Sequence, residues 1–555
     1  MNIIDATRAA PELVEKKATH LLAASILTYS LTFSYFTVLK YYTFDTYAGD
    51  LGIFEQSLWS TLRYGLLLYN TPELGIHFKT HFDPILLLFL PAYSIYPSPL
   101  TLLVLQSLLL PLGAIPIFYL ARDELGSTKA GLLFAVLYLL YPPLQGVNWY
   151  DFHPECLVPF FLGSAFYLFK KERYLPYFLL IILGMMCKET VSLIVFFMGL
   201  YGLWVNRRRI ADLVFTPKEL LMDGSVLSSL FTLCVSVLWY VVASKIIAMY
   251  SLTAQTYYLW WGYLGVGLLE MIIHIVLSPL YALQLALTPF PAKMFYLLVL
   301  FAPVAFLSFL NPPSLLIATP WLVASLLSLF PNYYLPVGTQ YPALIIPFVF
   351  ISAIYGAKAT VHLSRTLIQK ASKSKLTRKI LGKGKRLRTI TLEVYKRPLT
   401  VTLVILLVVG LSCGVAWTPL RLAKEISPHN RILETVVKLV PPYSLVSTQN
   451  DIFPHLSHNL NAYPVYYPDF EYDYILVDTT TIWYYVTPYN YGNWPKPPVS
   501  FNSVVPELLQ SKKYGLVIAI DGIMLLSKGY TGPPLVNISH PITTSLLLAK
   551  KPKAG

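Results

Sequence analysis

Apolar runs long enough to cross a membrane recur along most of the first 420 residues of this chain. A helix needs about 20 apolar residues to span the hydrocarbon core of a bilayer, so each run predicts a membrane-crossing helix. The chain has 555 residues, of which 55% are hydrophobic and 13% are charged, whereas a soluble domain has about 25% charged residues. This composition indicates an integral membrane protein and excludes a disordered chain, a collagen-like fibre and a disulfide-stapled secreted module.

The apolar runs predict an α-helical polytopic membrane protein with about eleven spans. A further apolar segment, residues 84–97, is short for a full crossing and contains internal prolines, so we expect it to be re-entrant or interfacial. The expected spans lie near residues 20–41, 99–121, 128–146, 155–170, 174–187, 189–205, 226–249, 293–310, 313–331, 342–357 and 399–418.

Basic residues collect in alternate connections between these spans, which is typical of cytoplasmic loops. With a cytoplasmic N-terminus, all four basic groups fall on the inside, and an odd number of spans leaves the C-terminus outside. We therefore interpret the net charge of +14 as topology and attraction to anionic membrane lipids, and we expect no nucleic-acid partner. The groups are Arg122 with Lys129, Lys170 with Lys171 and Arg173, Arg207 with Arg208 and Arg209, and the loop from Lys358 to Arg397.

The composition changes after the last span, which predicts two domains. We expect a multipass membrane domain over residues 1–418 and a small extracytoplasmic α/β domain over residues 419–555. No glycine-rich phosphate loop follows the expected strands, so nucleotide binding is not indicated. Helices are expected at 429–439 and 506–512, and strands at 443–448, 473–478, 514–520 and 522–527.

The conspicuous polar residues near the spans fall in three outer connections. A carboxylate at the centre of a bilayer costs about 3 kcal/mol even on the mildest scale, so such groups lie at an interface or a cavity and indicate a functional site. The expected site residues are Asp50, His81 and Asp83 in the first connection, Asp151, His153 and Glu155 in the second, and Lys188 and Glu189 in the third.

Two parts of this set also have a purely structural interpretation. Asp50 lies near the start of an expected amphipathic helix within residues 44–65, where it can act as the N-cap. Lys188 and Glu189 can form a local ion pair, or the lysine can extend to the membrane interface. Neither interpretation needs a ligand.

The second connection also has the spacing of a metal site. Asp151, His153 and Glu155 alternate along the chain, which would place them on one side of an extended segment. Two carboxylates and one imidazole suit manganese or magnesium, but they also suit a hydrogen-bonded binding site. The sequence therefore leaves the cofactor open.

Five ordered motifs resemble the prokaryotic membrane family catalogued as domain of unknown function 2079. They are DLGIFEQSLW, HFDPILLLFLPAYSIYPSP, YPPLQGVNWYDFHPE, MCKET, and NPPSLLIATPWL followed by TQYPALIIPF. The resemblance runs from about residue 44 to 357 and extends more loosely into the outer domain. One departure is Gln340, where the family often has a histidine before the tyrosine.

The layout is also similar to that of the C-superfamily of membrane glycosyltransferases (GT-C). Those enzymes have a cytoplasmic N-terminus, a first outer loop with an essential acid and often a soluble outer C-terminal domain, and they use sugars attached to polyprenyl phosphate. This resemblance implies a glycosyltransferase that takes a sugar from a polyprenyl-phosphate donor at the outer face. The alternatives are a transporter or flippase for a lipid-linked or anionic substrate, and a non-enzymatic envelope assembly protein.

The expected chemistry assigns roles to three of the site residues. Inverting transfer needs a base for the acceptor and cations for the departing phosphate. Asp50 is the expected catalytic base, and Lys188 and His153 are expected to serve the phosphate. The other substrate-binding candidates are His81, Asp83, Asp151, Glu155 and Glu189.

Overall fold

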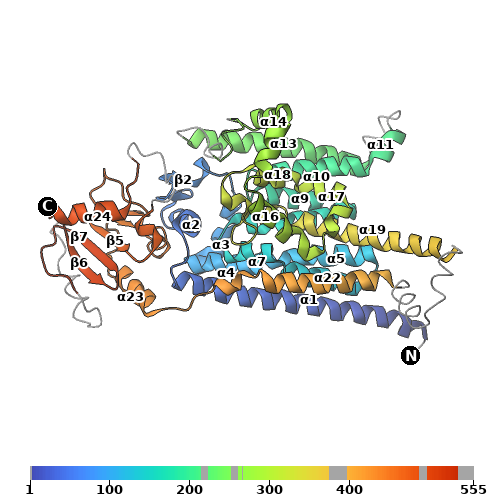
Figure 1. Ribbon diagram of the computed structural model, residues 1–555, viewed down its shortest axis with the longest axis horizontal. Coiled ribbons are helices and arrows are strands. Elements are labelled where there is room, and N and C mark those ends of the chain that lie inside the picture. Colours follow the sequence, from blue (N-terminus) through green and yellow to red (C-terminus); the bar gives the residue numbers. More distant parts are fainter. Residues whose placement is uncertain are drawn as a thin grey trace.

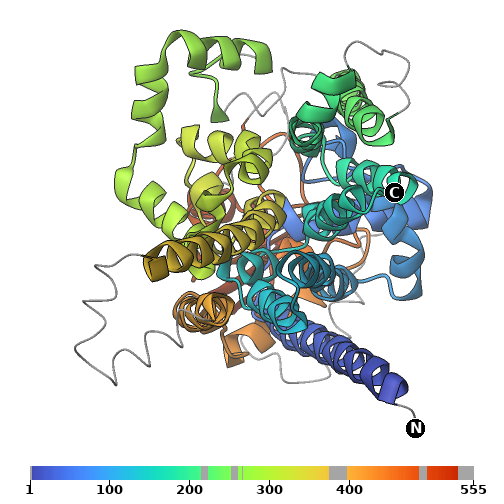
Figure 2. The same cartoon turned by 90° about the vertical axis from the view of Figure 1, so that its right-hand side faces the viewer.

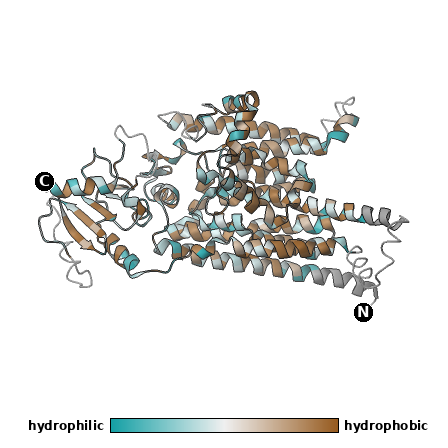
Figure 3. Ribbon diagram, in the orientation of Figure 1, coloured by the Kyte–Doolittle hydropathy of each residue, from teal (hydrophilic) through white to brown (hydrophobic). Residues whose placement is uncertain are grey.

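Helices form a bundle that carries a small α/β domain at one end (Figure 1). The computed structural model describes residues 3–213, 223–251, 260–265, 267–373, 397–486 and 497–535. The N-terminus and the C-terminal domain lie at opposite ends of the bundle (Figure 1). Apolar residues dominate the bundle, as Figure 3 shows.

The bundle is built around a long first helix, α1, which packs against α4 and α6. Most of the helices that follow it are short, and three further long helices in the described residues, α13, α19 and α22, complete the bundle. The helices are α1 (Ile3–Tyr42), α2 (Ile53–Tyr64), α3 (Leu86–Ile95), α4 (Pro99–Leu109), α5 (Ala114–Leu125), α6 (Thr128–Leu139), α7 (Pro142–Trp149), α8 (Val158–Lys170), α9 (Tyr174–Met185), α10 (Val191–Val205), α11 (Arg207–Leu213), α13 (Gly224–Tyr250), α14 (Leu268–Leu277), α15 (Pro279–Ala286), α16 (Phe290–Phe301), α17 (Pro312–Leu315), α18 (Thr319–Leu327), α19 (Ile346–Lys373) and α22 (Pro398–Ala416).

Fewer helices are long enough to span a bilayer than the sequence indicates. Within the described residues, five helical segments are long and apolar enough, and two sharply bent helix pairs raise the number to seven. Several expected spans form helices of only 12 to 15 residues, such as α9 and α10, which at 1.5 Å per residue reach about 20 Å. The chain is a multipass membrane protein, but the count of eleven full spans is not reproduced.

Helix α11 and the C-terminal end of α19 lie at the end of the bundle that carries the N-terminus (Figure 1), and Figure 2 shows this end facing the viewer. Arg122 of α5 pairs with Glu15 of α1, and Lys170 of α8 and Lys358 of α19 both pair with Glu124. These groups therefore share one side, as the alternation of basic connections requires. That this side is cytoplasmic stays a prediction.

The expected basic loop begins later than predicted. Helix α19 continues to Lys373, so residues 358–373 are helical, and they contain neither proline nor glycine to end the helix. The remainder of that expected loop, residues 374–396, lies outside the described residues.

The C-terminal domain contains a five-stranded sheet in the order β4-β3-β5-β7-β6. β4 and β5 are parallel to β3, whereas β7 pairs antiparallel with β5 and β6, so the sheet is mixed and only partly of the expected βαβ kind. The elements are α23 (Pro428–Val437), β3 (Val446–Thr448), β4 (Ala462–Tyr463), β5 (Tyr474–Asp478), α24 (Phe501–Gln510), β6 (Tyr514–Ile520) and β7 (Ile523–Lys528).

The core of this domain is shared with the first loop, which follows α1. Phe44 and Ala48 are buried in one cluster with residues of α23 and β3, including Val436 and Val446. The first loop is thus fixed to both the bundle and the C-terminal domain, and this arrangement positions the candidate site.

Candidate functional site

Three loops meet at the end of the bundle next to the C-terminal domain. The first contains a π-helical turn, Ala48–Gly52, that continues into α2. The second follows α7, and the third joins α9 to α10. Side chains about 30 to 110 residues apart pair across these loops, namely Asp50 with His153, Glu155 with Lys188, and His81 with Glu189.

Asp50 bonds to the second loop and does not cap its own helix. Its Oδ1 lies 3.1 Å from His153 Nε2, and its Oδ2 accepts a hydrogen bond of 2.7 Å from the Tyr150 hydroxyl. The helical segment is preceded by Tyr47, whose side chain makes no capping hydrogen bond. The interpretation of Asp50 as an N-cap is therefore wrong.

His153 is held beside the Asp50 carboxylate. Its Nδ1 lies 3.1 Å from the backbone oxygen of Asp151, which can only accept, so Nδ1 carries a proton. Burial lowers the pKa of His153, but its hydrogen bond to Asp50 and the charge of that carboxylate outweigh this effect and raise the pKa above its ordinary value. Gln106 of α4 fixes the loop by accepting a hydrogen bond of 3.0 Å from the His153 backbone N–H.

Lys188 pairs across the site with Glu155, at 2.6 Å, and not with its neighbour Glu189. Burial raises the pKa of Glu155, but the Lys188 ammonium and His153 more than offset this, so its pKa falls below the ordinary value. The expected local pair between Lys188 and Glu189 is wrong, because adjacent residues at this turn face different loops.

Glu189 instead binds the first loop. Its Oε1 lies 3.2 Å from His81 Nδ1, and its Oε2 accepts a hydrogen bond of 3.0 Å from the backbone N–H of Phe82. Burial raises the pKa of Glu189, but the charge of His81 and its hydrogen bond dominate and lower it to about 2.

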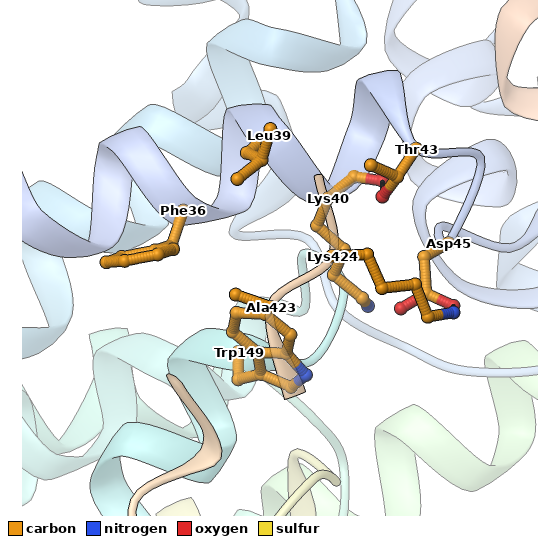
Figure 4. A pocket seen from close by; sticks show the side chains of 8 residues that line it. All are labelled: Phe36, Leu39, Lys40, Thr43, Asp45, Trp149, Ala423 and Lys424. Atoms are coloured by element: carbon orange, nitrogen blue, oxygen red, sulfur yellow. Dashed lines mark hydrogen bonds and ion pairs between the residues drawn. The ribbon is translucent and has the colours of Figure 1, made fainter. Parts of the chain in front are cut away.

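Asp151 lies behind the site and does not line the cavity. It is fully buried, with Oδ1 2.8 Å from Lys40 Nζ of α1 and Oδ2 accepting from the Tyr47 backbone N–H at 2.6 Å. Figure 4 shows Lys40 at the end of α1, where a narrow crevice is lined by Thr43 and Trp149. Asp151 therefore anchors the first loop from behind.

The geometry of the second loop does not support a divalent cation there. Pro154 begins a 3-10 helical turn, Pro154–Leu157, and this ends the alternation that would keep the three residues on one side. Asp151, His153 and Glu155 consequently bind three different partners. Across the described ranges, no group of three or more His, Cys, Asp or Glu side chains is arranged to hold a metal ion.

A buried chain of Glu73, His77 and Asp83 extends the site, and of these three only Asp83 was among the predicted site residues. His77 Nδ1 lies 2.7 Å from Glu73 Oε2, and its Nε2 lies 3.0 Å from Asp83 Oδ2. Burial lowers the pKa of His77, but the two carboxylates raise it well above its ordinary value. The signal in the sequence was the presence of Glu73 and His77 in the same outer connection as Asp83.

These groups line one end of a cavity of about 750 Å³. The remainder is largely apolar and is formed by α10, α13, α14 and α18, together with Trp261 and Tyr333. Asp83 Oδ1 is buried here without a hydrogen-bond partner among the described residues. Of the predicted site residues, seven line the cavity and Asp151 does not; the seven are Asp50, His81, Asp83, His153, Glu155, Lys188 and Glu189.

The family model described as "Predicted membrane protein (DUF2079)" matches residues 40–525. No curated protein sequence matches the chain. A crystal structure of ArnT from Cupriavidus metallidurans bound to undecaprenyl phosphate is similar, with a TM-score of 0.50 and 10% sequence identity, over 92% of this chain and 99% of that chain. ArnT from the same organism in the apo state has a TM-score of 0.43 and 11% identity, over 88% and 95% of the two chains. The fold is ArnT-like, and the similarity in layout to GT-C glycosyltransferases is confirmed.

Proposed function

The chain belongs to the DUF2079 family of predicted membrane proteins, and from this premise we propose that it transfers a sugar from a polyprenyl-phosphate donor to an acceptor at the outer face of the membrane. The observation that carries the proposal is the cavity, which is charged at one end and apolar along the rest. A lipid-linked sugar has the complementary form, with a phosphate and sugar at one end of a long hydrocarbon chain.

Lys188 is the proposed phosphate ligand. Its ammonium has three N–H donors, and the hydrogen bond to Glu155 uses one of them. The others can donate to phosphate oxygens, and charge-assisted bonds of this kind are about twice as strong as neutral ones. Both nitrogens of His153 are already engaged, so its contribution is the positive charge of the ring.

Asp50 is the proposed base. A carboxylate offers about four lone-pair sites, and Tyr150 and His153 occupy only two of them. The acceptor hydroxyl gives its proton to Asp50 as its oxygen bonds to the anomeric carbon. The bond from that carbon to the phosphate oxygen breaks, and its electron pair leaves with the phosphate, where Lys188 stabilises the added charge.

The remaining cavity residues have supporting roles in this proposal. The unpartnered oxygen of Asp83 accepts a hydrogen bond from a sugar hydroxyl. Glu155 and Glu189 fix Lys188 and His81 in place.

The outer-face assignment has a separate test. A cysteine at Ser374, between α19 and α22, should be labelled by a membrane-impermeant thiol reagent only from the cytoplasmic side. A cysteine at Ser503 of α24, in the C-terminal domain, should be labelled only from the outside. The reverse pattern would place the cavity on the cytoplasmic face.

Asp50→Asn tests the chemistry, because asparagine keeps hydrogen-bonding capacity but loses basicity. The assay measures transfer of radiolabelled sugar from a panel of polyprenyl-phosphate donors. We expect a loss of about a hundredfold to ten-thousandfold, the range of general-base catalysis. Asp45→Asn is the matched control: Asp45 is in the same loop but pairs with Lys424 outside the cavity, at 2.9 Å (Figure 4). Wild-type rates in Asp50→Asn would eliminate the base, and inactivity of wild type with every donor would favour a flippase or an assembly protein.

A further inference from the structure

The helical segment that carries Asp50 receives its N-cap from the C-terminal domain. The first backbone N–H groups of a helix have no partner within the helix. Here the N–H of Ala48 donates to both the backbone oxygen of Asn450, at 2.8 Å, and its side-chain Oδ1, at 3.0 Å. The N–H of Gly49 donates to the same Oδ1 at 3.3 Å. A residue about 400 positions away thus makes the bonds that an N-cap side chain normally makes.

Asn450 is itself fixed to the sheet of the C-terminal domain. It directly follows Gln449, which exchanges two hydrogen bonds with the backbone of Asp478 at the end of β5, at 3.0 and 2.8 Å. Asn450 is only 4% exposed. The sheet therefore holds the capping side chain of Asn450 in place.

The residues that follow Asn450 contact the same helical segment further along, from Gly52 to Gln56. The ring of Phe453 lies so close to Gly52 that a Cβ there would be 2.7 Å from it, and His458 Nε2 lies 2.6 Å from Glu55 Oε1. Beyond them, the backbone oxygen of Asn459 accepts a hydrogen bond of 3.0 Å from Gln56. The contact is continuous from residue 48 to residue 56, on the side away from His153.

We propose that Asn450 is a positioning residue that caps the Asp50 segment from the C-terminal domain, so that this domain completes the site. The proposal rests on the proposed function only for its effect on catalysis. Its structural part is independent: the Asp50 carboxylate is aimed at the cavity by a segment held between Asp151 on one side and Asn450 on the other.

Hydrogen exchange on the full-length protein tests the structural part directly. In Asn450→Ala, the amide of Gly49 loses its bond to the Asn450 side chain and should exchange about fivefold faster, the factor expected from loss of a typical cap. The amide of Ala48 keeps its bond to the backbone oxygen of residue 450 and should change less. Asn450→Asp keeps a capping acceptor and should restore wild-type exchange. Asn461→Ala is the matched control, because Asn461 bonds only within the C-terminal domain, to the Tyr443 carbonyl at 2.8 Å. Unchanged exchange in β5 would show that the domain remains folded.

The transfer assay tests the catalytic part. Asn450→Ala should lower kcat at least tenfold and leave KM for the lipid donor within twofold, because the cap aims the base and does not touch the lipid. Asn450→Asp should recover kcat. Unchanged exchange at Gly49 in Asn450→Ala would overturn the proposal whatever the activity. The wild type could be inactive with every donor while Asn450→Ala still exchanges faster at Gly49. That result would support the cap and refute only the proposed function.

Discussion

The two ends of the helical bundle carry the same kinds of ion pair in opposite settings. At the end with the N-terminus, Lys171 pairs with Asp123 while 48% and 23% of the two side chains are exposed. At the cavity end, Lys40 pairs with Asp151 with exposures of 6% and 0%. An exposed pair contributes about 0 to 1 kcal/mol, whereas removing one partner of a buried pair costs about 3 to 5 kcal/mol.

This difference separates charges that set topology from charges that build a site. The exposed basic groups act on membrane topology through their number and the side of the membrane on which they lie, so any one of them is dispensable. The buried groups are costly to desolvate and are retained where a specific geometry is required.

The largest expected effect is that of Lys40→Met. It leaves Asp151 buried without its cation and should lower the free energy of unfolding by about 3 to 5 kcal/mol. The double variant Lys40→Met with Asp151→Leu should recover most of this loss, because it removes the unpaired charge as well. Denaturant titration of the purified protein measures both. A loss below about 1 kcal/mol in the single variant would show that the two ends do not differ as described.

An intermediate effect is expected at Asp451, where the C-terminal domain meets the first loop. Burial raises its pKa to about 7, so the native state binds its proton more tightly than the unfolded state does. Stability associated with this group is therefore lost as the pH rises from about 4, its unfolded pKa, through 7. Asp451→Asn should raise the free energy of unfolding on the order of 1 to 3 kcal/mol at pH 8 and leave it unchanged below pH 4. A variant that is equally stabilised at both pH values would contradict this account.

The smallest effect is expected for Lys171→Ala at the exposed end. Its loss should cost less than about 1 kcal/mol at low salt. The difference from wild type should fade in about 0.5 M salt, where exposed charges are screened. A cost of several kcal/mol that persists in salt would place a structural ion pair at this end and remove the contrast.

Sequence reasoning was most accurate where one local pattern decides the structure. Apolar runs and basic clusters indicated a multipass membrane protein, and the sheet after residue 419 was expected, although β4, with only two residues, was not. Span length was overestimated because hydrophobicity does not reveal where a helix breaks. Phe290–Val304 is an example: it is an apolar helix of fewer than 18 residues that overlaps the expected span 293–310 and ends before it.

The site could be predicted as a set of residues but not as a set of pairs. Seven of its members were identified because charged residues are rare beside apolar runs. The contacts that build and support the site join residues far apart in sequence: Lys40 is 111 residues from Asp151, and Asn450 about 400 residues from Ala48. Lys40 was counted within the first span, where its charge carried no signal. Only the packing of the loops reveals these contacts.

The central claim is that the buried charged end binds the head of a lipid phosphate. The most direct measurement is an electron cryomicroscopy map of the full chain in a lipid nanodisc with undecaprenyl phosphate. The account predicts density for the phosphate within hydrogen-bond distance of Lys188 and for the chain along α10, α13, α14 and α18. Lys188→Met should abolish the head-group density. Lipid bound elsewhere, with the charged end of the cavity unoccupied by it, would contradict the account.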